Sequence, residues 1–261
     1  MRRIAVVCTA AVVLLAVAAG AYAASSTTNP YNGSFSFGTK KAGTAKKPVP
    51  LSYKLTVLGS NGAGQARPPK EFDVKTSIYG QKLDGKDFPT CSLAKIAAAK
   101  NDNVCPKGAM VAQGSLNAVL GADNDFTKAG DACNPILDVW NSGQGKETFF
   151  FVTNNTNHTC LGVATGGTPP YPGTYKTVGK YTVSNVPVPS DISEPLPGLA
   201  GSTPYEHLNF SSHSKKVKGK KVYSSASVAC TKGKRPWTVT VTSQYPGQPV
   251  QTSKSSGSSA C

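Results

Sequence analysis

The sequence predicts an all-β protein, and more narrowly a β-sandwich of short antiparallel strands. Three observations lead to this class. Short runs in which apolar and polar residues alternate recur along the chain, as half-buried strands require. The 26 glycines and 19 prolines gather largely between these runs, where they mark turns. Only one short stretch, between Cys91 and Cys105, has helical spacing, so packed sheets must supply the core.

The first 23 residues have the organisation of a secretory signal peptide. Arg2 and Arg3 form a basic start, residues 4–19 form an apolar core, and Ala21-Tyr22-Ala23 is a small-x-small cleavage site. The core is shorter than the roughly 20 apolar residues of a membrane span, and no later stretch is apolar enough to form one. We therefore expect an exported, soluble chain with no membrane span after residues 1–23 are removed.

Composition divides the mature chain into two parts. Residues 24–48 are rich in Ser, Thr, Gly and Lys, with one short candidate strand at Ser34–Phe37, and are predicted to form a flexible arm that folding does not need. Alternation is regular from residue 49 to residue 261, and no repeat of fixed period is present. A length of about 210 residues suits one sandwich. Residues 49–261 are therefore expected to form a single disulfide-stapled domain.

Nine segments of this domain show strand patterning. In the second segment Phe72, Val74 and Ile78 alternate with polar residues and are expected to point into the core. The run Phe149–Phe151 is too apolar for either side of its strand to face water, so this strand should be central. The nine segments are residues 51–57, 72–78, 109–120, 136–140, 148–152, 175–183, 205–212, 220–230 and 237–242.

The cysteines indicate a disulfide framework. Cys8 leaves with the signal peptide, and six cysteines in an exported chain are an even number available for bridges. Several connectivities are possible, and we expect nearest-neighbour pairing because each bridge then joins adjacent elements. The first bridge would close a loop containing a short helix capped by Ser92. The expected pairs are Cys91–Cys105, Cys133–Cys160 and Cys230–Cys261.

The chain is strongly basic. It carries 28 basic and 13 acidic residues, a formal net charge of +15 that becomes +13 without Arg2 and Arg3. Nearly all the remaining basic residues are lysines, whereas nucleic-acid sites favour arginine, so no nucleic-acid partner is expected. Five lysines gather at the tip of a hairpin expected from residues 205–212 and 220–230. They form a possible anion-binding site, with a merely solvated surface as the alternative: Lys215, Lys216, Lys218, Lys220 and Lys221.

No pattern in the sequence specifies a catalytic, cofactor or metal site. A serine hydrolase would need a Gly-x-Ser-x-Gly turn or an equivalent Ser/His/Asp set, and neither is recognisable. Glycoside hydrolysis would need two carboxylates at one site, but Glu147, Glu194 and Glu206 are scattered along the sequence. Calcium binding near Asp123 and Asp125 stays open, because the same residues also form turns on their own.

Two elements built around the cysteines stand out in the sequence. The first joins Phe88-Pro89-Thr90-Cys91 to a second part that begins at Cys105-Pro106 and ends at Gly114-Ser115. The second places Cys230 shortly before Trp237, with a last cysteine at Cys261. Together the two elements resemble those of exported actinobacterial proteins with no established activity. The resemblance covers roughly residues 48–261, and it implies export, an all-β fold and disulfides without supplying catalytic residues.

These observations favour an exported, non-enzymatic β-sandwich protein that is secreted or associated with the cell envelope. It would act as a binding or structural module. The expected partner is an anionic envelope polymer, a glycan or another protein. The alternative is an extracellular hydrolase whose site is assembled from residues distant in sequence.

Overall fold

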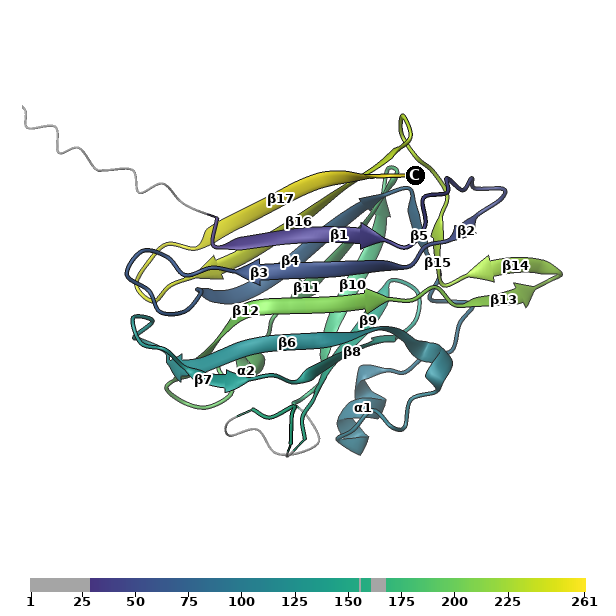
Figure 1. Cartoon of the computed structure of the whole chain (residues 1–261). Helices are drawn as coiled ribbons and strands as arrows, with labels where there is room; N and C mark the ends of the chain where they lie inside the picture. Colours follow the sequence, from purple (N-terminus) through teal and green to yellow (C-terminus); the bar gives the residue numbers. More distant parts are fainter. Residues whose placement is uncertain (1–28, 155, 161–167) are drawn as a thin grey trace, which may run out of the picture.

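The computed structural model describes residues 29–154, 156–160 and 168–261 (Figure 1). Antiparallel strands dominate this part of the chain, which confirms the all-β class. The predicted signal peptide, residues 1–23, lies outside the described residues.

One twelve-stranded sheet forms the body of the molecule. Eleven of its strands follow one another by hydrogen-bonded pairing, and β7 (Asp131–Cys133) pairs with one end of β6. The order is β1 (Tyr31–Phe37), β3 (Tyr53–Gly59), β12 (Leu199–Phe210), β6 (Met110–Ala122), β8 (Ile136–Asn141), β9 (Lys146–Val152), β10 (Tyr171–Val178), β11 (Tyr181–Pro187), β4 (Lys70–Tyr79), β16 (Lys234–Gln244) and β17 (Gln251–Ala260).

Smaller elements flank this sheet. A three-stranded sheet has the order β2 (Val49–Pro50), β15 (Ser225–Ser227), β5 (Gln81–Leu83), and a two-stranded sheet pairs β13 (Ser214–Val217) with β14 (Lys220–Tyr223). The described helical segments are α1 (Leu93–Ala99), α2 (Ser190–Ser193) and a 3₁₀ turn at Lys107–Ala109.

The main sheet curls until its first and last strands lie near each other (Figure 1). The backbone amides of Tyr31 and Gly33 in β1 donate to the hydroxyls of Ser253 (3.3 Å) and Ser255 (2.9 Å) in β17. A Cβ on Gly33 would lie 2.4 Å from Cβ of Val239 in β16, so glycine is what permits this close approach. The two facing layers expected of a sandwich are therefore opposite sides of one nearly closed sheet.

Strand β1 corrects the prediction of a flexible arm for residues 31–37. The candidate strand at Ser34–Phe37 is present but begins at Tyr31, and it pairs antiparallel with β3 along its whole length. Tyr31 and Phe35 are only 1% and 8% exposed, because alternation directs them into the main core cluster. Burial of these two aromatic side chains outweighs the polar composition that suggested an arm.

Strand β9 is buried on both faces, as its three phenylalanines predict. Phe149 and Phe151 belong to the core inside the curled sheet, whereas Phe150 packs on the outer face with Trp140 of β8. The outer face is covered by the loop that carries α1, where Ile96 is fully buried in the same cluster. The run of three phenylalanines is therefore apolar throughout because β9 packs against a separate core on each of its two faces.

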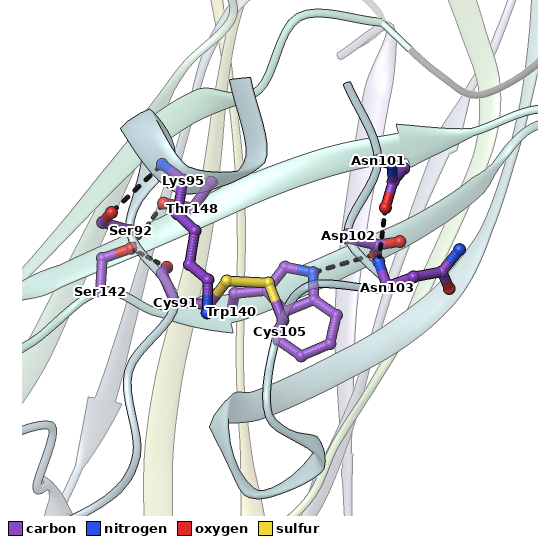
Figure 2. Close-up of a disulfide and its surroundings, with 10 residues drawn as sticks. All are labelled: Cys91, Ser92, Lys95, Asn101, Asp102, Asn103, Cys105, Trp140, Ser142 and Thr148. Atoms are coloured by element: carbon purple, nitrogen blue, oxygen red, sulfur yellow. Dashed lines mark hydrogen bonds between the residues drawn. A yellow bond between two sulfur atoms is a disulfide. The ribbon is translucent and has the colours of Figure 1, made fainter. Parts of the chain in front are cut away.

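A disulfide closes the α1 loop on itself, and hydrogen bonds such as that from the Ser142 hydroxyl to the Cys91 carbonyl (2.9 Å) fix the loop to the residues of β8 and its end (Figure 2). The hydroxyl of Ser92 caps the helix by accepting from the amide of Lys95 at 3.3 Å, as predicted. The indole N–H of Trp140 donates to Asp102 at 3.1 Å beside the bridge. The three bridges present are the predicted ones: Cys91–Cys105, Cys133–Cys160 and Cys230–Cys261.

Strand β4 departs from simple alternation. Its pairing with β16 skips one residue between Asp73, opposite Thr242, and Glu71, opposite Ser243. This β-bulge shifts the side-chain direction by one position, so Glu71 is buried and Phe72 is only half-buried. The prediction that Phe72 points into the core is therefore wrong for the start of the strand.

The basic hairpin exists with different arms from those predicted. Residues 205–210 belong to β12, which pairs with β3 and β6 in the main sheet and not with residues 220–230. The hairpin is the separate pair β13–β14, which projects from the body of the molecule (Figure 1). Its turn is made by Lys218 and Gly219, both with positive φ (49° and 75°).

Candidate functional site: a cavity inside the curled sheet

A cavity lies inside the curled sheet. The space in which the centre of a water-sized sphere fits is about 110 Å³. Aromatic rings form part of the wall, where Tyr171 stacks on Phe149 (5.4 Å between centroids) and approaches Phe151 (5.6 Å). About half of the other lining residues are aliphatic and include Leu55, Val74, Leu116, Leu120, Leu137, Val186, Ile192 and Leu208. An apolar interior of this kind, with a few polar groups, is the usual form of a small-molecule site.

Three glutamates from three strands share this cavity. They are Glu71 of β4, Glu147 of β9 and Glu206 of β12, only 6%, 7% and 9% exposed. Alternation along β9 places Glu147 on the same face as Phe149, and alternation along β12 places Glu206 on the same face as Leu208. From the sequence we expected Glu147, Glu194 and Glu206 to lie apart from one another. This expectation is wrong for Glu147 and Glu206, which line the same cavity. Glu194 lies at the outside, paired with Lys70.

Burial controls the ionisation of these carboxyl groups. It raises the pKa of Glu71 to about 8, the charge of Glu206 raises it further, and the nearby Thr203 hydroxyl offsets part of the change. Burial raises the pKa of Glu206 and of Glu147 to about 7 each. All three carboxyl groups therefore hold protons more tightly than exposed glutamates do, and they titrate near neutral pH.

Three polar atoms in the cavity wall lack hydrogen-bond partners within the described part of the chain. Oε1 of Glu71 and the hydroxyl oxygens of Thr168 and Ser202 are buried and unpaired. Buried polar groups in folded proteins almost always have a partner. The bulge in β4 turns the side chain of Glu71 toward the cavity. In β12, Ser202 borders a register shift between Ser202 and Tyr205. These irregularities place unsatisfied groups where an internal ligand or water would meet them.

The histidines and the aspartate loop make no comparable site. Among the described residues, each histidine contacts a group other than a carboxylate: His158 the carbonyl of Asn134, His207 the hydroxyl of Tyr205, and His213 the carbonyl of Met110. Asp125 accepts from the amide and hydroxyl of Thr127 and pairs with Lys128 at 3.1 Å, and the Thr127 hydroxyl is the main cause of its lowered pKa. Nowhere in residues 29–154, 156–160 and 168–261 do three metal-ligating side chains cluster.

The five lysines predicted as an anion site are brought together on the β13–β14 hairpin. Pairing places Lys216 directly opposite Lys221, while Lys218 forms the turn. Two of the five side chains lie over aromatic rings, Lys215 over Phe88 and Lys221 over Tyr223, each at 5.5 Å. The ammonium groups of Lys215 and Lys221 are therefore positioned by contacts with aromatic rings, and the other three lysines face solvent.

Comparison of the chain with protein-family models, with curated proteins and with solved structures finds no match. The resemblance to exported actinobacterial proteins therefore stays a prediction. Within the described residues no helix combines the length and the apolar character needed to cross a membrane. Three disulfides are consistent with an extracellular protein.

Proposed function

We propose that this chain is an exported, non-enzymatic binding protein, secreted or held at the cell envelope, that carries a small and mainly apolar molecule inside its curled sheet. The single observation that carries the proposal is the cavity itself. Its wall combines stacked aromatic rings, aliphatic side chains and a few buried polar groups. A close-packed interior normally leaves few voids larger than a water molecule, so a space of about 110 Å³ at the centre of the fold calls for an occupant.

The proposal is tested with benzyl alcohol, a neutral ligand with one ring. Isothermal titration calorimetry or ligand-observed NMR on the purified, disulfide-bonded protein should detect saturable binding, and the melting temperature should rise with ligand concentration. Ala118 lines the cavity, so Ala118→Phe should fill it and abolish binding. Ala122→Phe, an exposed position on the same strand β6, is the matched control and should retain binding. Equal binding by the two variants would place the ligand elsewhere.

A second candidate function is attachment to anionic envelope polymers through the β13–β14 hairpin. The observation that favours it is the concentration of five lysines on a projecting two-stranded sheet. Changing Lys215, Lys216, Lys218, Lys220 and Lys221 to Ser should weaken retention on an anionic polymer column, and the difference from wild type should shrink as salt rises. Unchanged retention would leave the lysines as a solubility feature.

The remaining alternative, an extracellular hydrolase, is favoured by one finding. Glu206 raises the pKa of Glu71 through its charge, so two carboxyl groups sit close enough to interact. Such a pair is what glycoside hydrolysis requires. Hydrolysis of nitrophenyl glycosides that disappears in Glu71→Gln would support this alternative over pure binding. The mainly apolar wall favours binding, since sugars present many hydroxyl groups that need polar partners.

A further inference from the structure

The charge inside the cavity is opposite to the charge of the whole protein. Basic residues outnumber acidic ones by 28 to 13 in the chain, yet none of the described residues that line the cavity is Lys, Arg or His. Three of the 13 acidic residues line it. Buried carboxyl groups are costly unless they are paired, so an uncompensated acidic interior in a basic protein points to a positive charge supplied from outside.

Two of the three glutamates form a local cluster with hydroxyl groups. Glu71 and Glu206 come from β4 and β12, which approach each other although they are not paired in the sheet. Ser202 borders the register shift in β12 and Thr203 lies within it; both line the cavity, and the Thr203 hydroxyl lies beside Glu71. Oε1 of Glu71 and the hydroxyl of Ser202 are buried without partners among the described residues. These groups offer acceptor oxygens to a donor that carries several hydrogens.

We propose that the ligand of this cavity is a small organic amine, an inference that rests on the proposed function. Its protonated nitrogen is bound by Glu71 and Glu206, and its apolar body lies against the aromatic wall. An ammonium group has three N–H donors and no acceptor, which matches a site of carboxylate and hydroxyl oxygens. The rings of Phe149, Phe151 and Tyr171 provide the surface for the apolar part. A neutral ligand of the same shape would leave the carboxyl groups without a counter-charge.

Proton linkage gives this inference a pH signature. The charge of Glu206 acts on Glu71, the charge of Glu71 acts in turn on Tyr31 and Tyr171, and no basic group is among these partners. An ammonium beside a carboxylate favours its charged form. Amine binding near neutral pH should therefore release protons, and amine affinity should increase as pH rises from about 6 to about 8, where Glu71 and Glu206 lose their protons.

The test compares benzylamine with benzyl alcohol, two ligands of nearly equal shape that differ in charge. At about pH 8 the amine should bind at least tenfold more tightly than the alcohol, since one unit of pKa change in a single carboxyl corresponds to a factor of ten. Glu71→Gln and Glu206→Gln should each remove most of this preference, and circular dichroism of each variant shows that it is folded. Glu194→Gln, an outer carboxyl, is the control and should keep the preference.

Each outcome decides a different point. If neither ligand binds the wild-type protein, the proposed function itself is wrong. If both bind with equal affinity, the cavity is a binding site but the amine assignment is wrong. If the amine preference survives in the Glu71→Gln/Glu206→Gln double variant, another carboxyl such as Glu147 holds the nitrogen, and the assignment to these two residues is overturned.

Discussion

Replacement of Glu71 by glutamine should change how the stability of the protein depends on pH. Burial raises the pKa of this carboxyl from 4.5 to about 8. Between these values the native state keeps the proton, whereas the unfolded state has lost it. The native state therefore binds one more proton than the unfolded state, and the free energy of unfolding must fall as pH rises through this window. The contribution of Glu71 is largest below its unfolded pKa and is lost toward about pH 8.

The size of the effect follows from linkage. One proton of difference corresponds to about 1.4 kcal/mol per pH unit, so removal of this group should flatten the stability curve by about 2 kcal/mol between pH 5.5 and pH 7. For a domain of this size, 1 kcal/mol changes the melting temperature by about 2–4 °C, which gives about 4–8 °C over the same interval. Glu147 and Glu206 act in the same direction and remain in the variant, so the stability of Glu71→Gln should still fall as pH rises, but less steeply than that of wild type.

Thermal unfolding followed by circular dichroism at constant ionic strength provides the measurement. The melting temperature of Glu71→Gln minus that of wild type should grow steadily from pH 5.5 to pH 7. The unsatisfied amide of glutamine adds a cost of about 1–3 kcal/mol, but this cost is independent of pH and displaces the whole curve without changing its slope. Parallel curves for the two proteins would refute the reasoning. Glu194→Gln alters an exposed carboxyl paired with Lys70 and serves as the control.

Three further substitutions test the fold. Phe35→Ala should lower the free energy of unfolding by about 3 kcal/mol in urea denaturation, because Phe35 is buried against Tyr53 and Trp237; no loss would mean that β1 is dispensable. Gly33→Ala should lower the melting temperature, at a cost of about 1–3 kcal/mol, because its Cβ would overlap Val239, whereas Ser34→Ala on the exposed side should be nearly neutral; equal effects would contradict the close approach of β1 to β16. The double change Cys230→Ser and Cys261→Ser opens a loop with a sequence separation of 31 residues and should cost about 3–4 kcal/mol, measured against wild type under non-reducing conditions; an unchanged midpoint would show that the bridge adds nothing.

The sequence was sufficient wherever alternation is uninterrupted. Leu51, Tyr53, Leu55 and Val57 are all buried, as period-two patterning predicts for that segment. The run Phe149–Phe151 correctly indicated a strand covered on both sides. Cysteine spacing was also sufficient, because each bridge joins neighbours in the sequence. In these cases a local signal determines the structure.

The cavity could not be predicted because its polar residues depend on register. Glu71 points inward only because β4 has one extra residue opposite β16, and nothing in the alternation of Phe72, Val74 and Ile78 marks that bulge. Glu206 and Glu147 become neighbours of one cavity through pairing of strands far apart in sequence. One signal was available: Glu147 and Glu206 each stand two residues before a buried apolar residue, on its side of the strand.

The opposite charges of surface and cavity lead to a last prediction, about the kinetics of amine binding. A protein with a formal net charge of +15 repels an approaching ammonium ion, but at physiological salt this repulsion is screened beyond about 8 Å. Inside the cavity the carboxyl groups are shielded from salt by burial, so the attraction that holds the bound amine changes little. The association rate of benzylamine, measured by stopped flow, should therefore rise as salt increases, while its dissociation rate stays nearly constant. A falling association rate would mean that the amine meets an acidic surface first, and the basic exterior would then play no part in entry.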